Sequence, residues 1–432
     1  MKVNLKPVFV TFEEAFFRRL PTLNEVKERA EKILKGLLTN VSEDVNVLEP
    51  FILTSPRGIE DLKKELTKDV DVVIVWRVGG MAHRLMASVG LLGVPFIMLG
   101  PGVLNHDIVA YLRQRGREAY APFDYEDLNK LIKYLKVRKA IKSSRVLVVS
   151  SMELPSFSAI SSAYDLDEMR AKLGVDSVLV SSEQLFDEYE VVGLSNEVKE
   201  LTDKLVSNAS RVEVDRANVE KSIQLYIAIK RLMEKYEANA VTINCAEPIF
   251  FKHKVTPCLA FSLLKDEGIP ASCEADLSAL LAMMALMWLT DKPAFMGNLW
   301  LHNKERNLIR FSHDVPPLKV KGFKEKELPY EVFDFHGQNY GTTLYVHVEL
   351  NEPVTFARVH ASLDKMLVST GTVVESHEGI ACRQTLDIRV EDARELMKRV
   401  ANYGHHFSLV YGDYSSDLEE LGEILGLSVE IA

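Results

Sequence analysis

Short apolar runs alternate with longer amphipathic segments through the first third of the chain. The apolar runs show no two-residue periodicity, and this predicts parallel strands that are buried on both faces. The predicted strands are residues 8–12, 46–49, 70–76, 95–99 and 145–150. The predicted helices are residues 23–38, 58–67, 83–91, 107–115 and 125–140. This alternation favours an α/β domain over residues 1–142, in which helices cover both faces of a parallel sheet.

The same alternation resumes after residue 142 and predicts a second α/β domain over residues 143–300. Its predicted strands begin with RVLVVSS and continue at residues 240–244 and 269–273. Its predicted helices are residues 166–173, 195–206, 214–237, 257–267 and 277–289. Because Asp276 directly precedes the last of these helices, its side chain is expected to cap the helix N-terminus.

Around residue 300 the pattern changes to short strands of period two that are separated by turn residues. Such strands are typical of an antiparallel sheet, and residues 301–432 are predicted to form a barrel-like domain. Helices predicted at residues 391–401 and 417–425 complete this domain. The predicted fold class is therefore α/β, with two doubly wound parallel-sheet (Rossmann-like) domains followed by an antiparallel β-barrel-like C-terminal domain.

Composition narrows the class of protein. The 432 residues carry a net charge of −10, which disfavours a nucleic-acid binder because such proteins present a basic face. The most apolar segment, residues 277–289, has about 13 residues and is too short to cross a membrane. The N-terminus lacks the apolar run of a signal peptide, so a cytoplasmic location is expected. Glutamine is scarce while lysine and glutamate are plentiful, which is typical of a thermophile.

The sequence indicates neither a cysteine-ligated zinc site nor a dinucleotide-binding motif. The four cysteines lack the CxxC spacing of a zinc site, and they are expected to be reduced residues without disulfides. The glycines of residues 79–80 and 100–102 follow predicted strands but do not form a GxGxxG motif. They are interpreted as tight turns and not as a dinucleotide site.

A divalent-metal site is predicted where several strand ends converge. Glu274 ends an apolar strand just before the long apolar helix, at the edge where parallel sheets bind ligands. Asn298 and His313 follow at later strand ends, and His405 and His406 open a strand near the C-terminus. Alternatives stay open at this point: Glu274 could form a loop salt bridge, and the histidine pair could be one surface and one core residue, because neighbouring strand residues face opposite sides.

Three segments carry a resemblance to a known family. Residues 258–298, CLAFSLLKDEGIPASCEADLSALLAMMALMWLTDKPAFMGN, resemble the core of the L-fucose isomerase and L-arabinose isomerase superfamily. Residues 404–427, GHHFSLVYGDYSSDLEELGEILGL, are similar to its second marker, in which a histidine begins a strand that a helix follows. Residues 354–376, VTFARVHASLDKMLVSTGTVVES, also resemble its barrel strands. The predicted domain order is that of the superfamily.

The resemblance implies an aldose–ketose isomerase that uses Mn²⁺ or another divalent cation. In the superfamily two carboxylates and a histidine hold the metal. Glu274 matches the first carboxylate, His406 matches the histidine, and Asn298 falls at the second carboxylate. These three residues are the candidate metal ligands that the resemblance implies, and Glu274 and Asn298 are the candidate catalytic residues.

The resemblance also implies a substrate and an assembly. The partner would be a small-molecule sugar, with no nucleic acid or membrane, and the chain would form a homo-trimer or homo-hexamer. The candidate substrate-binding residues are His405, His313, His83 and Arg77.

Asn298 departs from the family pattern. An amide oxygen can ligate a cation, but the amide carries no charge and cannot act as a base. Three hypotheses therefore stay open. Glu274 suffices for isomerisation, with help from Asp276, Glu247 or Asp314; or a related epimerase or lyase reaction takes place; or the protein binds carbohydrate without turning it over.

Overall fold

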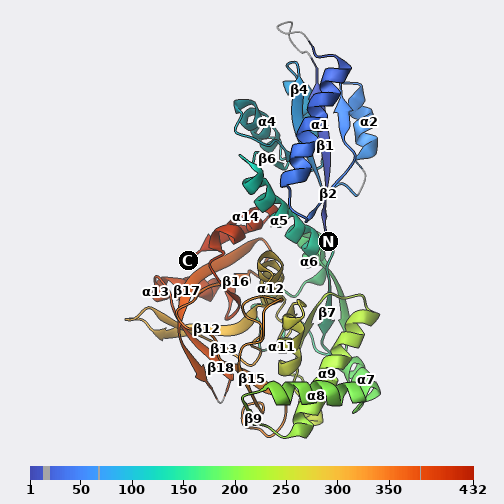
Figure 1. Ribbon diagram of the computed structural model, residues 1–432. Coiled ribbons are helices and arrows are strands. Elements are labelled where there is room, and N and C mark those ends of the chain that lie inside the picture. The colour runs from blue at the N-terminus through green and yellow to red at the C-terminus, as the bar shows by residue number, and fades with distance from the viewer. Residues whose placement is uncertain (13–19, 67–68, 380) are drawn as a thin grey trace. The chain divides into compact units, whose positions relative to one another are not determined.

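The computed structural model describes residues 1–12, 20–66, 69–379 and 381–432 (Figure 1). The described chain is a mixed α/β protein that contains parallel sheets and an antiparallel sheet. It divides into two compact units, Met1–Lys139 and Ala140–Ala432, and each is described by itself. Among the helices in the described residues, none combines the length and the apolar character that crossing a membrane requires.

The first unit is built on a parallel sheet with strand order β2-β1-β4-β5-β6, in which β3 also pairs with β1. Successive residues of β1 face opposite sides of this sheet. Val8 and Val10 pack in one core with residues of α2, α3 and α4, whereas Phe9 packs in another with Val26 and Ala30 of α1. Helices therefore cover both faces of the sheet, which explains why its strands lack a two-residue period.

The elements of the first unit match the predicted ranges in part. The first strand begins at residue 3, five residues before its predicted start, and the fourth helix begins at residue 103, four residues before. The short strands at residues 51–53 and 119–120 were not predicted. The strands are β1 (Val3–Thr11), β2 (Val45–Val47), β3 (Phe51–Leu53), β4 (Val72–Gly79), β5 (Phe96–Ile97) and β6 (Ala119–Tyr120). The helices are α1 (Leu23–Asn40), α2 (Gly58–Glu65), α3 (His83–Gly90), α4 (Val103–Arg113) and α5 (Tyr125–Lys142). The predicted end of the second helix at residue 67 lies outside the described residues.

The second unit contains a parallel sheet with strand order β11-β10-β7-β8. Its strands are β7 (Arg145–Val149), β8 (Asp176–Val180), β10 (Ala240–Ile243) and β11 (Ala271–Ser272). The accompanying helices are α6 (Leu166–Leu173), α7 (Ser182–Val192), α8 (Asn196–Asn208), α9 (Arg216–Lys235), α10 (Pro248–His253) and α11 (Cys258–Asp266). Sequence patterning missed β8, α7 and α10. Strand β8 lacks the apolar run of a buried strand, because it is an outer strand whose first four residues are only partly buried or exposed.

An antiparallel sheet forms most of the remainder, with strand order β16-β19-β12-β13-β18-β17-β20. β16 also pairs with β17, and β20 adds to β17 as a parallel strand. The strands are β12 (Phe295–Asn303), β13 (Leu308–His313), β16 (Pro353–Val359), β17 (Lys365–Glu378), β18 (Gln384–Arg389), β19 (His406–Tyr411) and β20 (Ser428–Ile431). The division expected near residue 300 stays a prediction, and that residue falls inside β12.

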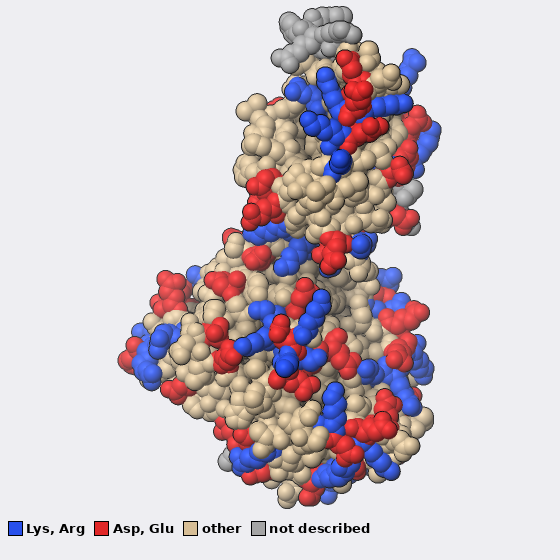
Figure 2. Space-filling view, viewed as in Figure 1, with Lys and Arg blue, Asp and Glu red and all other residues tan. Residues whose placement is uncertain are grey.

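Two helices and a small sheet complete the second unit. The helices are α13 (Ala393–Tyr403) and α14 (Ser415–Leu425). The small sheet has strand order β15-β14-β9, with β9 (Arg211–Glu213), β14 (Tyr330–Phe333) and β15 (Thr343–Val346). Figure 2 shows acidic and basic side chains interspersed over the visible face of each unit, so charge does not mark out a binding site there.

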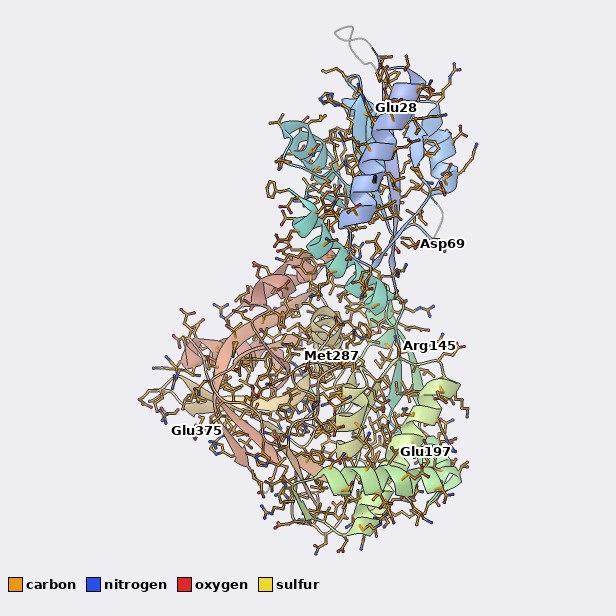
Figure 3. The ribbon with its side chains drawn as sticks, viewed as in Figure 1. Glu28, Asp69, Arg145, Glu197, Met287 and Glu375 are labelled. Carbon is orange, nitrogen blue, oxygen red and sulfur yellow. The ribbon has the colours of Figure 1, made fainter. Side chains whose placement is uncertain are left out.

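Helix α12 (Leu277–Thr290) lies at the centre of the second unit. Apolar residues surround the whole helix, which is typical of a buried helix, and every residue except Trp288 and Thr290 is buried. The helix packs against β10 and β11 of the parallel sheet and against β16 and β19 of the antiparallel sheet. Figure 3 shows Met287 of this helix in the interior, with Glu197 and Glu375 at the surface. The helix N-terminus is therefore held between the two sheets.

We expect Gly297→Ala to destabilise the second unit. A Cβ at this position of β12 would lie 2.4 Å from Cε1 of Phe311 on the neighbouring strand. Overpacking of this kind costs about 1–3 kcal/mol in the free energy of unfolding, which guanidinium titration measures. In a Phe311→Ala background the same change should cost less, because the opposing ring is gone. An equal cost in both backgrounds would show that the ring does not set the requirement for glycine.

Candidate functional site

Glu274 lies in a left-handed turn between β11 and α12. Its φ is 60° and that of Ala275 is 53°, a region that residues other than glycine seldom adopt. The turn is held in part by the Ala275 amide, which donates to the Ile243 carbonyl at 3.0 Å. Backbone strain of this kind persists only where the surroundings impose it, and it is frequent at functional sites.

Asp276 follows and is fully buried. It caps α12, since one of its carboxylate oxygens accepts from the Ala279 amide at 3.0 Å. The other oxygen pairs with Arg358 Nη1 on β16 at 2.7 Å, and both side chains are fully shielded from solvent. Burial alone would raise the pKa of the Asp276 carboxyl, but the Arg358 charge and a hydrogen bond from His406 hold it well below its usual range. Asp276 is therefore a permanent anion at this position.

His406, the first residue of β19, is oriented by that anion. Its Nδ1 lies 3.0 Å from Asp276 Oδ2. An ionised carboxylate only accepts hydrogen bonds, so Nδ1 carries a proton and Nε2 is the ring nitrogen that can offer a lone pair. Nε2 is buried, has no hydrogen-bond partner among the described residues, and lies 3.7 Å from Glu274 Oε2. The arrangement therefore directs an imidazole nitrogen at the Glu274 carboxylate.

His313, at the end of β13, faces the same carboxylate from another side. Its Nε2 lies 3.7 Å from Glu274 Oε1, and its ring centroid is 5.5 Å from that of His406. Its Nδ1 accepts a hydrogen bond from the backbone amide of Asp314 at 2.9 Å. Glu274 therefore has one imidazole near each of its two oxygens.

The charge state of Glu274 follows from these neighbours. Its side chain is 22% exposed, and burial favours the neutral acid. Interactions with His313, His406 and His405 outweigh that effect, and the pKa of Glu274 is lowered overall. Glu274 is therefore ionised at neutral pH, which is the form that can ligate a cation or accept a proton.

Asn298 lies beside these residues in the antiparallel sheet. In the strand register it is opposite His406 on β19 and opposite Ser312 on β13. Its amide nitrogen donates weakly to the Ser312 carbonyl at 3.4 Å and lies 4.0 Å from Cys382 Sγ. The register thus brings Asn298 next to His406, a candidate metal ligand. The side chain of Asn298 offers an amide there and not a carboxylate.

The other predicted substrate-binding residues fall in two groups. His405 stacks near His406, with 4.0 Å between ring centroids, and burial first and the neighbouring His406 second lower its pKa to about 4. His405 is therefore neutral at physiological pH. Arg77, on β4, and His83, the first residue of α3, belong to the first unit.

Arg358 is the residue of this site that sequence reasoning missed. Besides Asp276, its guanidinium donates to the carbonyl oxygens of Tyr403 at 2.7 Å and His406 at 2.8 Å. The signal was present in the strand pattern. Val354, Phe356 and Arg358 alternate along β16 on one face, and all three are fully buried. An arginine on an apolar strand face needs a buried anion, and Asp276 supplies it.

The donor set fits a divalent cation. Glu274, His405 and His406 each offer a ligand atom within 4.8 Å of the others, as do Cys273, Glu274 and His313. Metal-ligating histidines usually donate their other ring N–H to a carboxylate, which fixes the orientation of the ring. Asp276 is placed to do this for His406. The unpartnered, buried Nε2 of His406 and the ionised Glu274 are the residues best suited to hold such an ion.

We expect Asp276→Asn to destabilise the second unit strongly. The change would leave the fully buried Arg358 guanidinium without its counter-charge, which costs about 3–5 kcal/mol in the free energy of unfolding. Replacing both residues, as Asp276→Asn with Arg358→Met, should recover part of that loss because no charge then remains buried. Guanidinium titration of the three proteins tests this, and a loss below about 1 kcal/mol in the single variant would contradict it.

The comparison with known proteins points to one kind of enzyme. No protein-family model matches the chain. A protein named sulfoquinovose isomerase from Priestia megaterium is 25% identical over 327 residues, which are 71% of this chain and 68% of that protein. Proteins of the same name from Clostridium sp. (strain MSTE9) and Alkalicoccus urumqiensis are each 22% identical, over 219 and 225 residues, or 50% of this chain. The chain is thus distantly similar to sugar isomerases.

Proposed function

We propose that this protein is an aldose–ketose isomerase of the fucose/arabinose isomerase type that works with Mn²⁺ or another divalent cation. The observation that carries the proposal is the pair formed by ionised Glu274 and His406, whose buried Nε2 has no partner among the described residues. The similarity to proteins named sulfoquinovose isomerase supports the same reaction class. Together these findings favour isomerisation over the epimerase and lyase alternatives.

The reaction moves a carbonyl group between C1 and C2 of a sugar, by proton transfer between these carbons through an enediol. Glu274 is ionised and half-buried, so it can take a proton from one carbon and return it to the other. A bound divalent cation would polarise the sugar's carbonyl and hydroxyl oxygens and stabilise the enediolate charge. Glu274 and His406 would hold that cation, with the Asn298 amide oxygen as an uncharged third ligand.

The surrounding residues fix these groups in place. Arg358 holds Asp276, and Asp276 holds the His406 ring with its Nε2 directed at Glu274. This matters because a catalytic base and its electrophile must keep their relative position within a fraction of an ångström. His405 is neutral at physiological pH and is proposed to contact the sugar. Arg77 and His83 are proposed to contact it in trans, from the first unit of another subunit of the proposed assembly.

The sugar and the assembly are further parts of the proposal. Sulfoquinovose appears in the names of the similar proteins and is therefore the first substrate to test. Assembly as a homo-trimer or homo-hexamer is proposed from the family resemblance. A cytoplasmic location is proposed from the reduced cysteines, and closure of the antiparallel strands into a barrel-like domain is proposed from the two-residue strand pattern.

The direct test is proton NMR of sugars in D₂O with the protein and Mn²⁺, starting with sulfoquinovose, fucose and arabinose. An enediol route incorporates deuterium at C2 of the aldose or C1 of the ketose. Glu274→Gln should abolish this incorporation and weaken Mn²⁺ binding, because the amide is neither a base nor an anionic ligand. If no sugar exchanges with the wild-type protein while Mn²⁺ and sugar still bind, the protein is a carbohydrate-binding protein instead.

Asn298→Asp tests the position of the missing carboxylate. If Asn298 faces the cation, the added charge should lower the Mn²⁺ dissociation constant by roughly tenfold or more, because an anionic oxygen replaces a neutral one. Ser312→Asp on the neighbouring strand is the matched control for charge added nearby. Titration calorimetry with Mn²⁺ measures both variants, and an unchanged dissociation constant in Asn298→Asp would show that this residue does not bind the metal.

A further inference from the structure

The rings of His313 and His406 each direct a buried nitrogen at Glu274. The two rings differ in which of their nitrogens carries the proton. The Nε2 atoms of His313 and His406 each lie 3.7 Å from a different oxygen of Glu274. Both Nε2 atoms are buried without a hydrogen-bond partner among the described residues. By distance and burial alone the two rings would serve equally well as metal ligands, so the Nδ1 atoms decide between them.

The partners of the two Nδ1 atoms are opposite in kind. His406 Nδ1 faces the ionised Asp276 carboxylate, which only accepts, so Nδ1 carries a proton and Nε2 is the nitrogen that can offer a lone pair. His313 Nδ1 faces the backbone amide of Asp314, which only donates. His313 Nδ1 must therefore hold a lone pair, and the proton of the neutral ring lies on Nε2. One ring presents an acceptor to the site, and the other presents an N–H donor.

The donor state of His313 is held by its surroundings. The Asp314 carboxylate accepts from the Arg383 amide at 2.7 Å and contacts His336 Nε2 at 2.7 Å. His313 and Asp314 are only 4% and 3% exposed. Moving the ring proton to Nδ1 would set two N–H groups against each other and leave the buried Asp314 amide unpaired. An unpaired buried donor costs about 1–3 kcal/mol, so ligation through His313 Nε2 is disfavoured.

We propose that His313 is a hydrogen-bond donor to a substrate oxygen and is not a metal ligand, whereas His406 is the ligand. The role in the reaction rests on the proposed isomerase function. A neutral N–H beside the reacting carbons would stabilise the charge that develops on the enediolate oxygen. It gives the site a second polar group that acts on the sugar, close to the strand position where Asn298 provides no carboxylate.

Metal binding separates the two histidines without any sugar. The free Mn²⁺ signal in electron paramagnetic resonance gives the dissociation constant for the wild type, His313→Ala and His406→Ala. We expect His406→Ala to weaken binding by about tenfold or more and His313→Ala to change it by less than about threefold. Equal weakening in the two variants would overturn the assignment.

The protonated nitrogen can also be observed directly. Long-range ¹H–¹⁵N correlation spectra of the metal-free protein with ¹⁵N-labelled histidine distinguish the two tautomers, and the alanine variants assign the signals. We expect the proton on Nε2 of His313 and on Nδ1 of His406. A proton on Nδ1 of His313 would refute the proposal, and this readout holds even if no sugar is turned over and the isomerase function fails.

If a sugar is turned over, the contribution of the donor can be measured. His313→Gln keeps an N–H group near the position of Nε2, whereas His313→Leu removes it. We expect kcat to fall by roughly a hundredfold in the leucine variant and much less in the glutamine variant, with Mn²⁺ affinity unchanged in both. Equal kcat losses in the two variants would contradict a donor role. If the leucine variant does not fold, the kcat of the glutamine variant and the ¹H–¹⁵N spectra still test the proposal.

Discussion

The buried ion pair between Arg358 and Asp276 is the interaction on which the site depends. It joins the N-terminus of α12, which follows the parallel sheet, to β16 of the antiparallel sheet. Two charges removed from water are costly unless every donor and acceptor is used. Here Arg358 also donates to backbone carbonyls near the start of β19, and Asp276 also binds a helix amide and His406. The pair therefore specifies how the two sheets meet.

The same ion pair determines what the site can do chemically. Because Asp276 remains ionised, His406 is held in one tautomer and one orientation, and its lone pair is directed at Glu274. His313 is held in the opposite tautomer, because its Nδ1 accepts a hydrogen bond from the backbone amide of Asp314. Two chemically identical side chains thus gain different properties from their partners alone. A comparison of residue types at aligned positions could not detect this difference.

The sequence predicted the scaffold better than the site. The apolar run at residues 277–289 and the cap Asp276 placed α12 to within one residue, because that helix is apolar on all sides. Glu274 was a candidate because it closely follows a strand, at the edge where parallel sheets bind ligands, and its role stays a prediction. The strand pattern marks Arg358 as a buried charge, but it could not supply the partner, because Asp276 is 82 residues away in the chain. The tautomer of His406 depends on a long-range contact of the same kind, whereas that of His313 depends on the adjacent Asp314 amide. Strand β8 lacked the apolar run of a buried strand.

The left-handed turn at Glu274 and Ala275 lowers the stability of the fold at the position that carries the carboxylate of the site. Each residue with a Cβ in that conformation costs about 1 kcal/mol or more relative to glycine, which adopts it freely. Glycine at position 274 would relieve this strain and remove the carboxylate together with it. The protein thus tolerates a weaker turn in order to keep an anion between two imidazoles. Selection for thermal stability alone would favour a chain that has lost this carboxylate.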